Sequence, residues 1–341
     1  MADEVECDFA RSGPVTEAGP ADSGPSRTLR RTALRASDGV RIDAAYEPFA
    51  GSGNAGAADR LPGAIVLAHG FSGSVDRPAM RRAVQVFAQY GAVITFSFRG
   101  HGSSGGHSTV GDREVLDLAA AVRWARSMGH AHVATVGFSM GGSVVVRHGA
   151  LYPLPAPDAR EGRRTVVHPG TAASPSATAH TAWEAPALGD PALAVPDTAQ
   201  PHSEHSDIFV SVSAPARWYY RGTAPMRRLH WVIQRPVGRV ISRYGLRTRI
   251  HPHDWDPVPL SPVAAAPSLA PRPLLVVHGD QDAYFPLDHP RSLAEAADPD
   301  CTELWEVPGF GHAENAAEPQ LLHRIGAWIT AEWPKAPHSP A

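Results

Sequence analysis

Short apolar runs alternate with stretches of helical periodicity along most of the chain. Residues 64–68 (Ala-Ile-Val-Leu-Ala) are continuously apolar, as expected of a strand that is covered on both faces. Within residues 78–90, Met80, Val84 and Phe87 have the spacing of one helix face. Patterns of these two kinds predict strands at 40–45, 64–68, 92–98, 132–136, 208–212, 274–277 and 303–307. They predict helices at 78–90, 113–128, 140–150 and 321–329.

Strands that alternate with helices are typical of an α/β fold, in which a mostly parallel sheet carries helices on both faces. Residues 28–152 and 207–334 follow this pattern and are expected to form one domain. Two segments break it. Residues 1–27 are rich in Pro, Gly, Ser and acids, and residues 153–206 contain nine prolines and a single aromatic, Trp183. Such compositions bury too little apolar surface to offset the entropy of ordering. We therefore predict a disordered N-terminal tail and a low-complexity insertion.

The insertion joins the end of a helix to the start of a strand. In a parallel sheet such a connection lies at the edge opposite to the carboxyl ends of the strands, where ligands bind. A second excursion, residues 214–270, leaves from that carboxyl edge instead, and we predict that it forms a helical cap over the site. Its central helix, 226–244, carries an apolar stripe and should be kinked by Pro236.

Two features of the predicted cap can each be interpreted as functional or as purely structural. Trp218, Tyr219 and Tyr220 lie just beyond a strand's carboxyl end, so they are candidates for lining a substrate pocket, with packing inside the cap as the alternative. Four arginines interrupt the apolar stripe: Arg228, Arg235, Arg239 and Arg243. They could attract an acidic substrate or a membrane surface, but a solvated helix face is the plainer interpretation.

The pattern Gly-x-Ser-x-Gly, which holds the nucleophile of many serine hydrolases, occurs twice. The match around Ser139 follows the predicted strand 132–136 directly and leads into an apolar helix. A sharp strand-to-helix turn needs glycines on both sides of the serine, and the helix N-terminus then offers free N–H groups. The match around Ser104 is followed by polar residues. We therefore predict Ser139 as the nucleophile.

A serine nucleophile needs a base that is itself oriented by an acid. His312 lies in the loop after the last predicted strand, and Asp282 follows the strand before it. Both loops belong to the carboxyl edge of the sheet. Asp280 is the alternative acid, although its position closer to the strand suits a turn. An oxyanion hole would use the backbone N–H groups of Met140 and Phe71.

Several motifs together resemble the series found in the α/β-hydrolase superfamily. They are His69-Gly70-Phe71, Arg99-Gly100-His101-Gly102, the Ser139 turn, His278-Gly279-Asp280-Gln281-Asp282 and Gly311-His312. The resemblance covers residues 29–333 apart from the insertion. It implies a mostly parallel eight-stranded sheet, an acyl-enzyme mechanism and no cofactor. His69 itself is expected to be a structural, hydrogen-bonding residue, with a catalytic role as the alternative. Relatives often have aspartate where this chain has Ser97, a difference expected to affect loop hydrogen bonds only.

Composition narrows the remaining classes of function. The formal net charge of −3 over 341 residues does not suit a nucleic-acid-binding protein. There is no run of about 20 apolar residues and no basic, apolar leader, so we expect a cytoplasmic protein without stable membrane insertion. Cys7 and Cys301 do not indicate a disulfide framework. Residues 251–256 contain histidines and aspartates, but prolines and the lack of helical spacing argue against a metal site.

The sequence therefore predicts a serine hydrolase that acts on a small-molecule acyl substrate, most directly a carboxylic ester. An amidase or aminopeptidase with the same triad is an alternative. A second alternative, from another class, is a binding or receptor protein that turns over slowly. The sequence does not indicate an oligomeric state.

Overall fold

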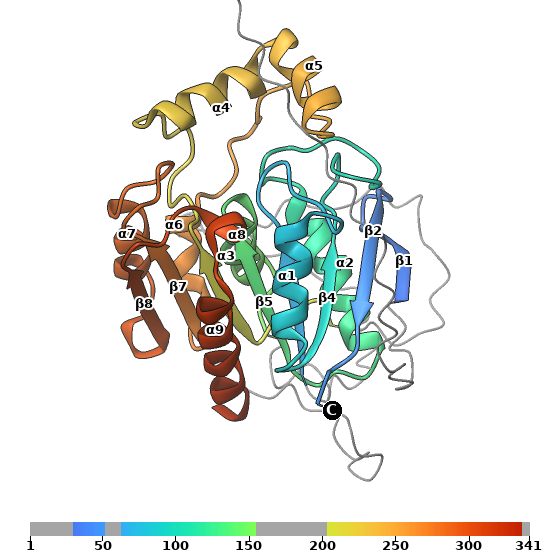
Figure 1. The fold of residues 1–341 in the computed structure, drawn as a ribbon, viewed down its shortest axis with the longest axis vertical. Helices are drawn as coiled ribbons and strands as arrows, with labels where there is room; N and C mark the ends of the chain where they lie inside the picture. Colours follow the sequence, from blue (N-terminus) through green and yellow to red (C-terminus); the bar gives the residue numbers. More distant parts are fainter. Residues whose placement is uncertain (1–29, 52–62, 155–202, 336–341) are drawn as a thin grey trace, which may run out of the picture.

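The computed structural model describes residues 30–51, 63–154 and 203–335. Within them, eight strands form one sheet in the order β1-β2-β4-β3-β5-β6-β7-β8 (Figure 1). β1 and β2 are antiparallel to each other, β2 is antiparallel to β4, and the other neighbours are parallel. The strands are β1 (Arg30–Arg35), β2 (Arg41–Glu47), β3 (Ala64–Ala68), β4 (Ala92–Phe96), β5 (Val133–Phe138), β6 (Ile208–Val212), β7 (Leu274–Gly279) and β8 (Thr302–Val307). This confirms the predicted mostly parallel eight-stranded sheet.

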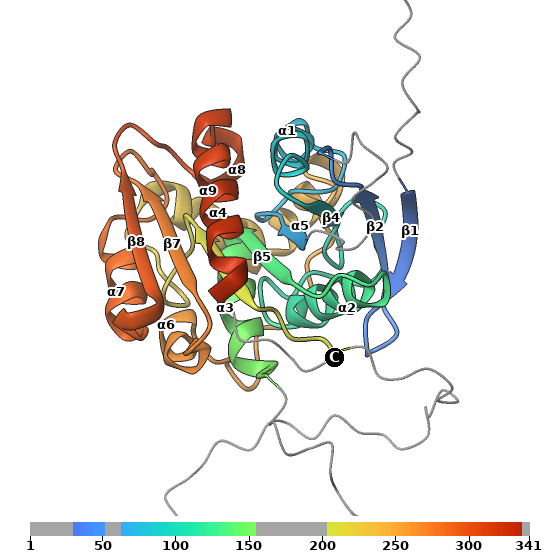
Figure 2. The ribbon, with the colours of Figure 1, turned by 90° about the horizontal axis from the view of Figure 1, so that it is seen from below.

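Helices cover both faces of the sheet. In Figure 2, α1 and α9 lie on one face, and α2, α3, α6 and α7 lie on the other. The helices are α1 (Pro78–Phe87), α2 (Glu114–Ser127), α3 (Met140–Leu151), α4 (Ala224–Gln234), α5 (Pro236–Gly245), α6 (Pro262–Ala265), α7 (Asp288–Ala296), α8 (Ala313–Ala316) and α9 (Pro319–Glu332). Ile65 and Leu67 of β3 pack into one apolar core and Val66 packs into the other, which explains why this strand is continuously apolar.

Several elements differ from the sequence prediction. The helices α6, α7 and α8 were not predicted. β1, which was not predicted, is an edge strand with three arginines among its six residues and no apolar run. A short, charged edge strand resists pairing with other chains but leaves little hydrophobic signal. The predicted kinked helix 226–244 is two helices, because Arg235 between them is extended (φ −95°, ψ 137°). The residue before a proline disfavours the helical conformation, whereas Pro236 itself suits the first position of α5.

The two excursions leave from opposite edges of the sheet. α4 and α5 stand above the carboxyl ends of the strands, at the top of Figure 1. The described ends of the insertion, Leu154 after α3 and Ser203 before β6, belong to the other edge. The predicted tail, residues 1–27, and most of the predicted insertion, residues 153–206, lie outside the described residues. In the part of the chain that is described, no helix is long and apolar enough to cross a bilayer.

Candidate active site

Ser139 lies at a strained turn between β5 and α3. Its backbone has φ 52° and ψ −117°, a conformation that non-glycine residues rarely adopt. The flanking glycines make the turn possible. A Cβ atom on Gly137 would lie 2.2 Å from the carbonyl oxygen of Gly141, and a Cβ atom on Gly141 would lie 2.2 Å from that of Ala68. Neither position therefore accepts a side chain, and the serine is held at the carboxyl edge at the start of a helix.

His312 connects this serine to Asp282. The Nε2 atom of His312 is 2.9 Å from the Oγ atom of Ser139, and its Nδ1 atom is 2.7 Å from the Oδ2 atom of Asp282. Since the carboxylate accepts from Nδ1–H, the Nε2 atom is left to accept the serine proton. The three side chains come from loops after β5, β7 and β8 and form one hydrogen-bonded chain.

The Asp282 carboxylate is held in its charged form by several donors. Its Oδ1 atom accepts hydrogen bonds from the backbone N–H groups of Tyr284, at 2.8 Å, and Phe285, at 3.1 Å. Burial raises the pKa of Asp282, but the hydrogen bond from His312 and these backbone donors outweigh burial and bring the pKa below its ordinary value. The carboxylate is thus preorganised to accept from His312 and to stabilise a positive imidazolium.

Two residues without a sequence signal position the histidine. The ring of Tyr284 stacks on that of His312, with centroids 4.3 Å apart and an interplanar angle of 28°. The Oγ atom of Ser213, at the end of β6, accepts a hydrogen bond of 3.1 Å from the N–H group of Ala313. Ala313 has φ 54°, so this bond fixes a strained turn directly after His312.

Backbone donors are available beside Ser139. Within the described residues, the N–H groups of Met140 and Phe71 donate to no protein acceptor, and both residues line the same pocket as Ser139. His69 fixes the conformation of the loop that contains Phe71. Its Nδ1 atom donates to the carbonyl oxygen of Gly70, at 2.6 Å, and its Nε2 atom accepts from the N–H group of Phe98, at 2.9 Å. The arrangement fits the predicted oxyanion hole.

The buried carboxyl group of Glu314 also contacts the loop of residues 69–71. This residue was not identified from the sequence. Its Oε1 atom accepts a hydrogen bond of 3.1 Å from the N–H group of Gly70. A Cβ atom on Gly70 would lie 3.2 Å from the Oε2 atom of Glu314 and 3.3 Å from the Cβ atom of Ser139. The carboxyl group is therefore next to the nucleophile. Burial raises the pKa of Glu314, and its backbone hydrogen bonds only partly oppose that effect.

Asp280, the alternative acid, and Ser104, the alternative nucleophile, are hydrogen-bonded to main-chain groups. The Oδ1 atom of Asp280 accepts from the N–H group of Gly309 at 2.7 Å and thereby joins two loops. The Oγ atom of Ser104 donates to the carbonyl oxygen of Ser97, at 2.5 Å, and accepts from the N–H group of Asp43, at 2.9 Å. Neither side chain is bonded to His312.

A pocket with a mainly apolar lining opens at Ser139 under the cap. All three aromatic candidates, Trp218, Tyr219 and Tyr220, line it together with α4 side chains. Trp218 is fixed in place because its Nε1 atom donates to the carbonyl oxygen of Pro259 at 2.9 Å, while the guanidinium of Arg147 lies 5.9 Å from its ring centre. These aromatic side chains therefore are part of the cap and also line the pocket.

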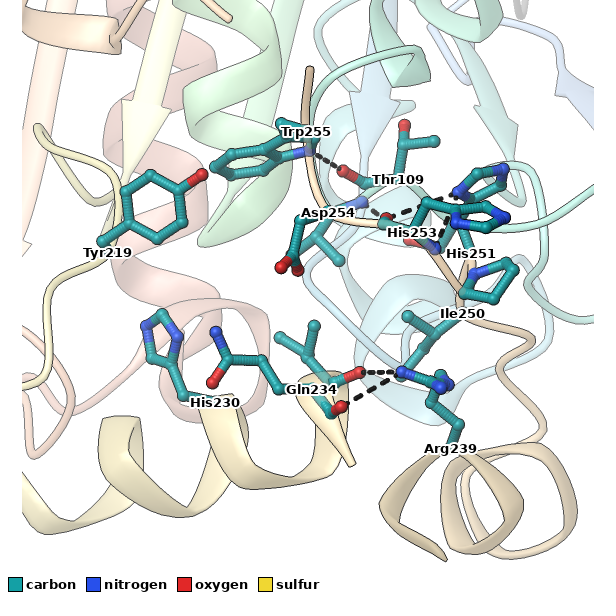
Figure 3. Close-up of a pocket in the computed structure, with 14 residues that line it drawn as sticks. Thr109, Tyr219, His230, Gln234, Arg239, Ile250, His251, His253, Asp254 and Trp255 are labelled. Carbon is teal, nitrogen blue, oxygen red and sulfur yellow. Dashed lines mark hydrogen bonds between the residues drawn. The ribbon is translucent and has the colours of Figure 1, made fainter. Parts of the chain in front are cut away.

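A second, more polar compartment adjoins the first. The two share lining residues, among them Tyr219, His230 and Trp255. Figure 3 shows Tyr219 and Trp255 at one side of this compartment and His251 and His253 at the other. The Nε1 atom of Trp255 donates to the carbonyl oxygen of Thr109 at 2.6 Å. Across the described ranges, no group of three or more His, Cys, Asp or Glu side chains is arranged to hold a metal ion.

Comparison with known proteins agrees with this architecture. Residues 63–315 match the family described as alpha/beta hydrolase fold. The esterase Pf2001 of Pyrococcus furiosus has a TM-score of 0.57 and 18% identity, over 93% of this chain and 98% of that one. DcsB, solved with a substrate analogue, has a TM-score of 0.56 and 14% identity, over 91% and 100% of the two chains.

A third solved structure is the esterase domain of a Rhodothermus marinus protein. It has a TM-score of 0.52 and 15% identity, over 91% of this chain and 99% of that one. No curated protein matches the chain significantly by sequence. At these identities the solved structures establish a shared fold, and the chemistry has to be argued from the site.

Proposed function

Because the chain belongs to the alpha/beta hydrolase fold family, we propose that it hydrolyses carboxylic esters through an acyl-enzyme formed on Ser139. The observation that carries the proposal is the hydrogen-bonded chain from Ser139 through His312 to Asp282, with distances of 2.9 and 2.7 Å. Those are the distances at which a base can take the serine proton and a carboxylate can orient the base.

In the first half of the reaction, the Oγ atom of Ser139 attacks the ester carbonyl carbon while its proton passes to the Nε2 atom of His312. The carbonyl π pair moves to the oxygen, which the N–H groups of Met140 and Phe71 stabilise as an oxyanion. Asp282 stabilises the imidazolium that forms. Collapse of the intermediate breaks the bond to the alcohol oxygen, and His312 returns its proton to that oxygen as the alcohol leaves.

In the second half, water replaces the alcohol. His312 takes a proton from water as the hydroxyl attacks the acyl-enzyme, and the same oxyanion hole holds the new tetrahedral intermediate. When this intermediate collapses, the bond to Ser139 breaks and His312 returns the proton to Oγ. The products are a carboxylic acid and the restored serine, so the cycle consumes one water and needs no cofactor.

The two compartments give the proposal a substrate class. The pocket at Ser139 is lined mainly by apolar and aromatic side chains, including Phe71, Trp218 and Tyr220, which suits a small or medium acyl chain. The adjoining compartment contains His251, Asp254 and other polar groups, which suits a polar alcohol. We propose that the acyl half of the ester lies in the first compartment and the alcohol half in the second.

The test is pre-steady-state hydrolysis of p-nitrophenyl esters of increasing acyl length, compared with the matching p-nitroanilides. We expect a burst of nitrophenol equal to the concentration of active sites, followed by steady turnover, and much slower release of nitroaniline. Faster cleavage of the anilides would instead favour an amidase. A burst without turnover would favour a binding or receptor protein that retains the triad.

A further inference from the structure

The helix α5 turns its apolar side away from the protein. Val237, Val240, Ile241 and Tyr244 have the spacing of one helix face, and their side chains are between 50% and 76% exposed. The opposite face carries the small residue Ser242, which is fully buried. An amphipathic helix on a globular protein normally has the reverse orientation, with its apolar side in the core.

Helix α4 extends the same surface. Trp231 is 48% exposed, and α4 and α5 pack closely because α5 has a glycine at the contact. A Cβ atom on Gly238 would lie 2.6 Å from the Cα atom of Val232. The other side of α4 carries Met226 and Ile233, which line the pocket at Ser139. The two helices thus form one layer with the pocket on its inner side and an apolar stripe on its outer side.

The charge of this layer has one sign. Residues 213–250 contain nine arginines and no lysine, aspartate or glutamate, although the whole chain has a net charge of −3. Among the described residues, Arg217 with Asp288 is the one ion pair that any of these arginines makes. Several arginines are exposed close to the stripe: Arg227, Arg228, Arg235 and Arg243. We define the cap face as these four arginines together with Trp231, Val237, Val240, Ile241 and Tyr244.

We propose that the cap face docks the protein on an anionic lipid bilayer. A helix with apolar and aromatic residues on one side and basic residues along its flanks is suited to lie in the plane of a membrane surface. The α5 stripe would enter the boundary between headgroups and acyl chains, and the arginines would extend to the lipid phosphates. Trp231 and Tyr244 have the amphipathic rings that favour this boundary.

The positive charge of the cap face argues against other partners that could cover its apolar stripe. A second copy of the chain would bring two arginine-rich faces together, and like charges in contact oppose association. An acidic protein would satisfy the arginines, but its polar, charged surface would leave the exposed apolar side chains of α5 without an apolar partner. A bilayer supplies both the anionic layer and the apolar interior.

Docking in this orientation would place the pocket of Ser139 about one helix diameter, roughly 10 Å, from the lipid surface. The docking surface goes beyond the proposed ester hydrolysis and does not depend on it, because none of its exposed residues lines the pocket at Ser139. Binding and hydrolysis can therefore be tested separately.

The experiment is co-flotation of the full chain carrying Ser139→Ala, which prevents lipid hydrolysis, with vesicles of phosphatidylcholine alone or of equal parts phosphatidylcholine and phosphatidylglycerol. We expect binding to the anionic vesicles at least tenfold tighter than to the neutral ones. The binding should weaken at about 1 M salt, where the screening length falls to about 3 Å.

Two variants and a control assign the binding to the cap face. Val240→Asp should reduce it at least tenfold, because a charge then has to enter the apolar boundary. The double variant Arg228→Ala/Arg243→Ala should reduce it about twenty-five-fold, at about fivefold for each arginine. Arg324→Ala, which removes an exposed arginine from α9, should leave vesicle binding unchanged. Val240→Asp should also leave hydrolysis of a soluble short-chain ester unchanged.

Four results would overturn the proposal. They are equal binding to neutral and anionic vesicles, no vesicle binding at all, binding that survives both variants, and self-association in sedimentation velocity that Val240→Asp abolishes. Binding to polyglutamate in place of vesicles would count against it as well and would indicate an acidic protein partner.

Discussion

Residues 137–141 and 102–106 have the same pattern, Gly-x-Ser-x-Gly, in opposite surroundings. Ser139 has a strained backbone at the end of a strand, and its hydroxyl group faces His312. Ser104 is 2% exposed, and its hydroxyl group is bonded on both sides to main-chain groups of neighbouring strands and loops. A hydroxyl group that is already satisfied by structure cannot be activated by a base. The pattern therefore acquires its chemical meaning from the strand and helix around it.

The largest expected effect is at Ser139. Ser139→Ala should lower the turnover of a p-nitrophenyl ester by about 10⁴- to 10⁶-fold, because the acyl-enzyme can no longer form. Initial rates at saturating substrate measure the loss, and circular dichroism checks the fold. A variant that retained a tenth of the activity would remove the distinction between the two serines.

The next effect separates two aspartates in the same loop. Asp282→Asn should lower turnover by about 10⁴-fold, because the amide cannot hold the histidine tautomer or stabilise the imidazolium. Asp280→Asn should retain most of the activity, since Asp280 bonds to Gly309 instead. The two variants have the same chemical change at neighbouring positions, so each is the other's control. The reverse ranking would identify Asp280 as the acid.

Replacement of Ser104 should lower the stability of the fold and leave the catalytic activity unchanged. Ser104→Ala leaves a buried carbonyl group and a buried N–H group without their partner, which should lower the free energy of unfolding by about 1–3 kcal/mol. Turnover per folded molecule should be unchanged. Urea unfolding curves and active-site titration measure the two quantities, and a large loss of turnover with intact stability would contradict the structural role.

Glu314 should give the smallest effect, and a pH-dependent one. Burial raises its pKa in the folded chain, so the folded state binds the proton more tightly than the unfolded state does. The charged carboxylate then destabilises the fold at neutral pH, and this cost disappears as the pH falls to the ordinary range of a carboxyl group. Glu314→Gln keeps an acceptor for Gly70 and should raise the free energy of unfolding by about 1 kcal/mol near pH 7.

Urea unfolding at about pH 7 and at about pH 4 tests this sign, because the ordinary glutamate pKa is about 4.3. The gain from Glu314→Gln should shrink at the lower pH. A gain that grows on acidification would mean that the carboxylate is stabilised in the folded chain. Glu314→Ala is the matched variant. It removes the acceptor for Gly70 and should lower turnover, through a displaced oxyanion loop, more than Glu314→Gln does.

Much of the site is predictable because its geometry restricts the local sequence. The elbow excludes every residue but glycine at 137 and 141, and the order of strands places Asp282 and His312 at the same edge. Ser213 and Glu314 were not predicted, because their roles arise from contacts with residues about 100 and 244 positions away in the chain. Nothing in their immediate sequence marks them.

The cap shows a second limit of prediction from the sequence. Its apolar stripe correctly predicts amphipathic helices, but periodicity does not tell which side of a helix faces the protein. In α4 the apolar residues Met226 and Ile233 face the pocket, whereas in α5 Val240 and Ile241 face outward. Extended Arg235 lets the second helix turn independently of the first. Tertiary orientation of this kind needs the structure.

The central claim is that Ser139, and not Ser104, is the activated nucleophile. Its most direct test is to react the full chain with a fluorophosphonate and to locate the adduct by peptide mass spectrometry. We predict one adduct per chain, on the peptide that contains Ser139, and its loss when Asp282 is replaced by asparagine or Ser139 by alanine. An adduct on Ser104, or full labelling of the Ser139→Ala variant, would contradict the account.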